Sequence, residues 1–147
     1  MPVATLDLLD ASVWLPLLVA DHPHHRRATE YWSNEAPDQV AFCRITAMGL
    51  LRLLTNRTVM AHQVLTVPAA WERYRALRAL PEVAFLREAD GLEEQLEQWL
   101  QGPGFTPAQW TDAYLAAFAH TGHCRLVAFD DDFRRFSGLS FFHLTDA

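Results

Sequence analysis

Residues 3–19 read VATLDLLDASVWLPLLV and decide the fold, because a short apolar strand passes directly into a helix there. The first seven residues are mostly apolar, which is typical of a buried strand, and the run ends at Asp10. Asp10 and Ser12 are both residue types that favour a helix N-cap. The next stretch, VWLPLLV, is apolar enough for a buried helix that tolerates Pro16 in its first turn.

Strands and helices continue to alternate along the rest of the chain. We therefore predict a single domain, residues 1–147, with a three-layer α/β/α fold and a mainly parallel central sheet. The further strands are expected at residues 39–43, 83–86, 125–129 and 139–144, and the further helices at 22–32, 46–54 with Thr46 as N-cap, 67–80, 91–100 and 106–120.

Composition excludes several classes of protein. The chain has 147 residues, of which 50% are hydrophobic, and this excludes intrinsic disorder. The net charge is −6 and all 12 cationic side chains are arginine, so bulk positive charge does not hold this protein to nucleic acid. The nearly apolar run at residues 11–20 is too short to cross a membrane. We expect a cytoplasmic protein that spans no membrane.

Two acidic residues follow strands of the predicted sheet. Asp10 comes after the first strand and Asp130 comes after the strand at residues 125–129. Ligands of open parallel sheets bind beyond the carboxyl ends of the strands. These two carboxylates are therefore expected to meet in one crevice.

Asp112 is the third candidate, and it lies on a helix face that should be buried. The neighbours of Asp112 at helical spacing are small and apolar: Ala108, Leu115, Ala116 and Ala119. A carboxylate on such a face is costly unless a partner compensates its charge. Three clustered carboxylates repel one another, and a hard cation such as Mg²⁺ or Mn²⁺ removes the conflict.

Each acid also has an ordinary structural interpretation. Asp10 could serve only as a helix N-cap, and Asp112 could pair with an arginine. Asp131 and Asp132 could be solvated acids at the start of a short helix. The agreement of three placements, at Asp10, Asp112 and Asp130, favours a metal site.

Four motifs in this order resemble those of PIN-domain ribonucleases, especially the VapC-type toxins of bacterial toxin–antitoxin pairs. They are LLDASVW at residues 8–14, FCRITAMGLLRLLTN at 42–56, TDAYLAA at 111–117 and LVAFDDDF at 126–133. The resemblance implies a metal-dependent endoribonuclease that cuts tRNA or a ribosomal RNA loop. It further implies that Asp10, Asp112 and Asp130 hold Mg²⁺ or Mn²⁺, and that the protein is a homodimer inhibited by a cognate antitoxin.

The chain departs from the family pattern at two positions. The second family acid usually follows the residue equivalent to Thr46, where this chain has Ala47. A Thr or Ser usually stands two positions before the fourth acid, where this chain has Ala128. Thr46, a water molecule or another acid could fill the gap, and Asp132 is the nearest spare carboxylate.

Further side chains could support the site. Ser12 lies next to the first acid, and Arg52 stands among leucines at residues 50–54. Arg52 either extends to solvent along these leucines or pairs with Asp10 or Asp112. An apolar helical stripe consists of Trp71, Tyr74, Leu77 and Leu80. Such a stripe usually belongs to the core, although in this family such helices can also serve the dimer or the antitoxin surface.

The sequence leaves two other functional classes open. Ala47 supports a degenerate PIN-like binding module without catalysis. A phosphatase-like or receiver-like domain with an acidic metal pocket would usually carry a lysine near the phosphate, and this chain has none. An acidic crevice would also attract a basic antitoxin tail, which could inhibit the enzyme by occupying the site.

Overall fold

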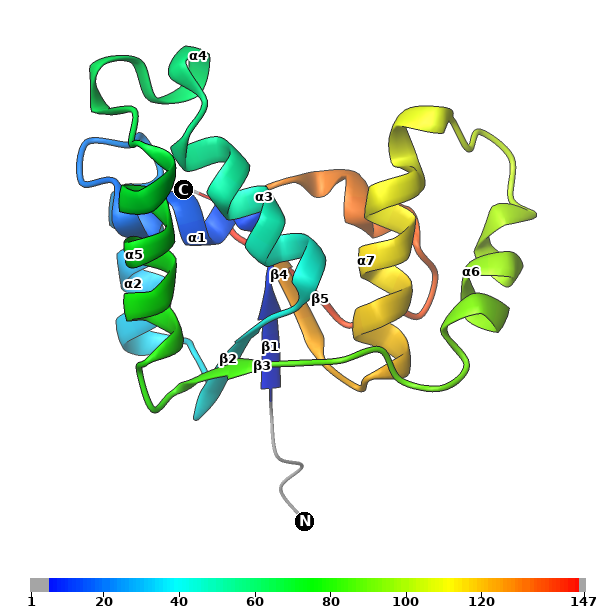
Figure 1. The fold of residues 1–147 in the computed structure, drawn as a ribbon. Helices are drawn as coiled ribbons and strands as arrows, with labels where there is room; N and C mark the ends of the chain where they lie inside the picture. Colours follow the sequence, from blue (N-terminus) through cyan, green and yellow to red (C-terminus); the bar gives the residue numbers. More distant parts are fainter. Residues whose placement is uncertain (1–5, 146–147) are drawn as a thin grey trace.

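The computed structural model describes residues 6–145 and contains one five-stranded sheet with the order β3-β2-β1-β4-β5 (Figure 1). All four strand pairs are parallel. The strands are β1 (Leu6–Leu9), β2 (Gln39–Phe42), β3 (Val83–Phe85), β4 (Arg125–Ala128) and β5 (Phe141–His143). Residues 3–5 of the first expected strand lie outside the described residues.

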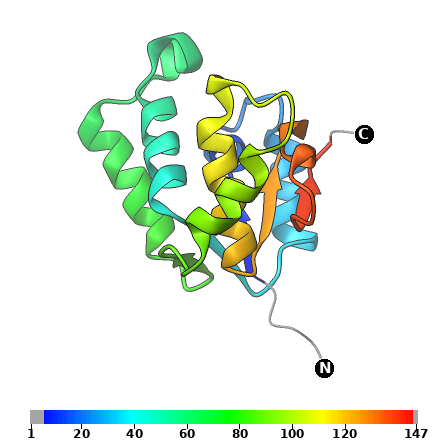
Figure 2. The same cartoon turned by 90° about the vertical axis from the view of Figure 1, so that its right-hand side faces the viewer.

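Helices cover both faces of the sheet, which confirms the predicted three-layer α/β/α fold. Figure 1 shows α1, α2 and α5 on one side of the sheet and α6 and α7 on the other, and Figure 2 shows α6 packed on α7. No helix within residues 6–145 has the length and apolar character needed to cross a bilayer. The helices are α1 (Ala11–Leu18), α2 (His25–Asn34), α3 (Arg44–Leu54), α4 (Arg57–Met60), α5 (Val67–Arg78), α6 (Leu92–Leu100) and α7 (Trp110–Thr121), with 3₁₀ turns at Ala61–Gln63, Pro107–Gln109 and Asp131–Arg135.

Alternate residues of the central strands supply two separate cores. Leu9 of β1 and Val127 of β4 belong to the core under α1, α3 and α5, whereas Leu8 and Leu126 belong to the core under α7. This two-residue period follows from the pleat of a strand, which sends successive side chains to opposite faces. Both faces are apolar, as expected of a parallel sheet buried on two sides.

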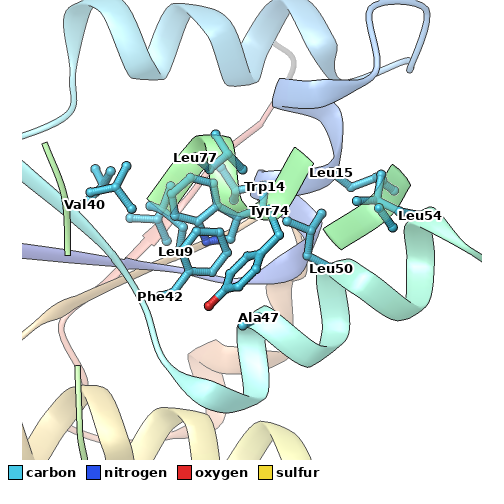
Figure 3. Close-up of a cluster of buried hydrophobic side chains, with 14 of the residues drawn as sticks. Leu9, Trp14, Leu15, Val40, Phe42, Ala47, Leu50, Leu54, Tyr74 and Leu77 are labelled. Atoms are coloured by element: carbon cyan, nitrogen blue, oxygen red, sulfur yellow. The ribbon is translucent and has the colours of Figure 1, made fainter. Parts of the chain in front are cut away.

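Aromatic packing fixes the larger core (Figure 3). The Trp14 ring stacks on the Phe42 ring with centroids 3.9 Å apart, and Tyr74 meets Phe42 edge-on at 5.2 Å. Ala47 is fully buried in this cluster beside Leu50. The residue that stands in place of the second family acid is therefore part of the apolar core.

Several helix starts differ from the sequence prediction, and α1 and α2 begin at Ala11 and His25 rather than at residues 13 and 22. Cys43, rather than Thr46, is the N-cap of α3, and Thr46 occupies the third helical position. The Thr46 hydroxyl accepts a hydrogen bond from the Cys43 backbone N–H at 2.9 Å, so its side chain completes a capping box. The predicted helix at residues 106–120 begins as a 3₁₀ turn, and the α-helix starts only at Trp110.

A buried ionic network ties β1 to β4 near their amino ends. The Asp7 carboxylate is fully buried and accepts two hydrogen bonds from Arg125, at 3.0 and 2.8 Å, and one from the Tyr31 hydroxyl at 2.5 Å. Asp7 and Arg125 are register partners on neighbouring strands. The Arg125 guanidinium also lies over the Phe142 ring, with 4.6 Å between Cζ and the ring centroid.

Removal of the guanidinium should destabilise the fold. Arg125→Met leaves the Asp7 carboxylate buried without a cation, so we expect the free energy of unfolding to fall by about 3 kcal/mol in urea denaturation. Arg26→Met on the exposed face of α2 is the matched control and should change it little. An Arg125→Met protein as stable as the wild type would show that Asp7 does not depend on this pair.

Candidate metal centre

The candidate centre lies at the carboxyl ends of β1 and β4. Asp10 follows β1 directly, and its backbone N–H donates to the Val127 carbonyl at 2.9 Å. Asp130 stands two residues after the end of β4. The adjacent parallel strands therefore place these two acids at the same edge of the sheet, as the sequence predicts.

Three carboxylates come together at this edge. Asp112, Asp130 and Asp132 each offer an oxygen, and these oxygens all lie within 4.8 Å of one another. Asp112 stands in the first turn of α7, and the other two acids belong to the exposed segment after β4. Asp10 does not belong to this group of three, but its charge acts on Asp112.

Asp112 reaches the cluster because α7 packs tightly on the sheet. The helix buries four alanines, among them Ala116 and Ala119, and small side chains permit close approach of helix and strands. Leu115 on the same face is also buried, as the sequence predicts. Ala108 is exposed and precedes the α-helix, so the buried face begins only at Asp112 itself.

The electrostatics of the cluster oppose full ionisation. Burial, followed by the charges of Asp130, Asp10 and Asp132, raises the pKa of Asp112 from 3.8 to about 6. Burial also raises the pKa of Asp10, and the charge of Asp130 adds to this rise, although hydrogen bonds from Ser12 oppose it. A bound cation would stabilise the ionised carboxylates and relieve their repulsion.

Hydrogen bonds from backbone N–H groups hold two of the acids in place. The Asp10 carboxylate accepts from the Ser12 backbone N–H at 3.3 Å and is the N-cap of α1. The Asp130 carboxylate accepts from the Asp132 backbone N–H at 2.9 Å and caps the turn that follows. The Ser12 hydroxyl accepts from the Phe129 backbone N–H at 3.2 Å, so Ser12 connects the segments that carry both acids.

Within residues 6–145, neither of the other predicted supporting residues, Thr46 and Arg52, forms a hydrogen bond or ion pair with the clustered acids. Thr46 is buried, and its hydroxyl also donates to the Cys43 carbonyl at 3.0 Å. Arg52 is exposed and, within residues 6–145, pairs with neither Asp10 nor Asp112. Its side chain lines a hollow between α3 and α5, which agrees with the solvent-directed interpretation.

The sequence gives an ambiguous signal for Asp132. An acid at the start of a short helix is usually solvated, and Asp132 is indeed exposed, yet its oxygen joins Asp112 and Asp130. Asp132 follows Asp130 by two residues, and both carboxylates reach the cluster, whereas Asp131 between them pairs with Arg134 in the 3₁₀ turn. This two-residue spacing is the feature of the sequence that points to Asp132.

The raised pKa of Asp112 predicts a pH-dependent effect of Asp112→Asn on the metal-free protein. Between about pH 4 and about pH 6 the folded state binds more protons than the unfolded state, so Asp112 makes the wild type less stable as the pH rises. Asparagine does not titrate, so the melting temperature of Asp112→Asn minus that of the wild type should increase as the pH rises through this range.

Thermal melts in the presence of a chelator measure this difference. Asp38→Asn, which changes an exposed acid just before β2, is the control and should give a difference that varies little over the same range. A melting-temperature difference for Asp112→Asn that stays constant with pH would contradict the electrostatic account.

Comparison with known proteins identifies relatives of this chain. The PIN domain family model matches residues 8–139. Ribonuclease VapC41 of Mycobacterium tuberculosis is 41% identical over 138 residues, which cover 90% of this chain and 94% of the relative.

Solved structures share the fold at lower identity. Mycobacterium tuberculosis VapC20, described as a Sarcin-Ricin loop cleaving toxin, superposes with a TM-score of 0.65 at 22% identity, covering 90% of this chain and 95% of that one. A toxin–antitoxin complex from Klebsiella pneumoniae gives a TM-score of 0.62 at 18% identity, covering 96% and 99%.

Proposed function

The chain belongs to the PIN-domain family and is a toxin-type endoribonuclease like its VapC relatives, and we propose that its acidic cluster is the metal-dependent catalytic centre. One observation carries the proposal: oxygens of Asp112, Asp130 and Asp132 lie within 4.8 Å of one another. We further propose that residues 1–147 form a single domain and that the protein works in the cytoplasm, where it meets RNA.

The chemistry of the donor set fits Mg²⁺ or Mn²⁺. These hard cations prefer carboxylate oxygens, keep several waters and accept phosphate oxygens from a substrate. Asp112, Asp130 and Asp132 would hold the ion, and Asp10 would complete the site from β1. When bound, such an ion supplies an activated water nucleophile and positive charge for the phosphodiester oxygens.

The protein contributes rigid placement of the carboxylates. Asp112 projects from a helix fixed by its alanine face, and Asp10 is held as an N-cap by Ser12. Asp130 is oriented by the backbone N–H of Asp132. The substrate is an RNA, and we propose that it is a tRNA or a ribosomal RNA loop.

Asp132 compensates for the acid that is missing at Ala47. Ala47 is buried in the apolar core and offers no ligand, whereas the Asp132 oxygen lies in the cluster. The alternative of a degenerate binding module is not favoured, because a relative with 41% identity is named a ribonuclease.

Removal of single carboxylates should abolish metal-dependent cleavage. Asp112→Asn, Asp130→Asn and Asp132→Asn each keep the side-chain shape but weaken ion binding, so cleavage of a tRNA pool or an rRNA-loop oligonucleotide with Mn²⁺ should fall by about 100-fold or more. The measurement is the initial rate of RNA cleavage on denaturing gels.

Asp38→Asn removes the same charge from an exposed site at the amino end of β2 and should cleave at the wild-type rate. Folded Asp112→Asn, Asp130→Asn and Asp132→Asn proteins that all retain this rate would contradict the proposed centre.

A cognate antitoxin with a basic tail is the proposed inhibitor. The chain carries a net charge of −6, and its acidic cluster attracts arginine or lysine side chains. A basic tail placed at Asp112 and Asp130 would occupy the position of the ion and the RNA phosphate.

The α3–α5 face is the proposed homodimer surface. It is a hollow of about 550 Å³ whose apolar lining includes Met48, Val67 and Trp71, and these side chains are 38%, 74% and 44% exposed. Apolar side chains gathered on one face are typical of an interaction surface. Tyr74 and Leu77 of the same predicted stripe are buried, so only its Trp71 end and the exposed Leu80 face solvent.

Trp71→Glu should convert the protein from a dimer to a monomer, because it places a charge in the apolar contact. Light scattering coupled to size exclusion measures the mass in solution. Leu80→Glu is the matched control, since Leu80 is 38% exposed but does not line the hollow. A dimeric Trp71→Glu protein would exclude this face.

A further inference from the structure

The backbone of Phe129 joins β4 to Asp130, and hydrogen bonds hold both its N–H and its carbonyl. Its N–H donates to the Ser12 hydroxyl at 3.2 Å, and its carbonyl accepts from Nε2 of His143 at 2.9 Å. Phe129 immediately precedes Asp130 in the chain, so its orientation determines where the Asp130 carboxylate projects.

His143 is well placed to make this contact. It is the last residue of β5 and lies opposite Ala128 of β4 in the parallel register. Its side chain is only 18% exposed, and its ring stacks on that of Phe141 with centroids 6.0 Å apart. The ring is therefore confined beside the end of β4.

The hydrogen-bond partners assign the tautomer of His143. A carbonyl can only accept, so Nε2 carries the proton toward Phe129. Nδ1 then accepts from Nη2 of Arg134 at 3.3 Å, and Arg134 also donates through Nε to Asp131. An oxygen of the Asp131 carboxylate lies 3.4 Å from Nδ1.

One side chain thus contacts both ends of the segment that carries two cluster acids. Phe129, Asp131 and Arg134 face His143, whereas Asp130 and Asp132 face Asp112. Groups that orient metal ligands commonly change metal affinity when they are removed.

We propose that His143 is a positioning residue for the acidic cluster: its Nε2–H···O=C bond to Phe129 sets the backbone from which Asp130 and Asp132 reach the divalent ion. This inference rests on the proposed function, because it concerns metal binding at the same cluster. His143 itself contacts neither the ion nor the RNA in this account.

The test is calorimetric titration of Mn²⁺ into the RNA-free protein, at a temperature well below the melting point of each variant. His143→Phe keeps a ring of similar shape but removes the donor, and it should weaken Mn²⁺ binding about tenfold. His143→Gln can present an amide N–H near the position of Nε2, so it should recover most of the affinity. His62→Phe, which alters an exposed histidine on the turn after α4, is the matched control and should bind like wild type.

The outcomes separate this inference from the proposed function. Wild-type protein that binds no Mn²⁺ would overturn both. If the wild type binds Mn²⁺ and His143→Phe binds it with the same affinity, only the positioning role is overturned. A lower melting temperature of His143→Phe would then mean that His143 is a packing residue. If His143→Phe does not fold, His143→Asn takes its place, because the shorter amide cannot reach the Phe129 carbonyl. Wild-type affinity in His143→Asn would also overturn the positioning role.

Discussion

Repulsion between carboxylates at the carboxyl end of β4 is the constraint on which the site depends. Asp112, Asp130 and Asp132 converge there, and none of them pairs with a cationic side chain within residues 6–145. Burial, followed by the charges of Asp130, Asp10 and Asp132, raises the pKa of Asp112. A divalent cation bound at this edge, as we propose, would offset the repulsion.

The same two strands show the contrast between a balanced and an unbalanced carboxylate. Near the amino end of β1, the buried Asp7 is compensated by Arg125 on β4 and by the Tyr31 hydroxyl. After the carboxyl end of β1, Asp10 caps α1 and accepts a hydrogen bond from the Ser12 backbone N–H, and within residues 6–145 it pairs with no cationic side chain. The network around Asp7 needs no ligand and stabilises the sheet, whereas the opposite edge is left with net negative charge for binding.

Parts of this arrangement could be predicted from the sequence because they follow from local patterns. Alternating apolar strands and helices predict the parallel sheet, and Asp10 and Asp130 follow strands whose carboxyl ends share an edge. Asp112 is detectable because it stands beside Leu115 and Ala116 on a buried helix face. These inferences need only periodicity and the geometry of parallel sheets.

Other features depend on contacts that no local pattern encodes. The assignment of Thr46 as N-cap is wrong because the Cys43 backbone turns one residue before α3 and uses the Thr46 hydroxyl from within the helix. The position of Asp132 beside Asp112 and Asp130 depends on a 3₁₀ turn, and the contact between His143 and Phe129 depends on the register of β5 against β4. The pairing of Asp7 with Arg125 joins residues 118 positions apart and requires knowledge of the strand order.

A crystal structure of the protein grown with Mn²⁺ tests the central claim most directly, through anomalous scattering recorded at the manganese absorption edge. The account predicts one anomalous peak bounded by carboxylate oxygens of Asp112, Asp130 and Asp132, at coordination distance from those that ligate it. A map with no peak at this edge of the sheet in manganese-saturated crystals, or with manganese bound only elsewhere, would contradict it.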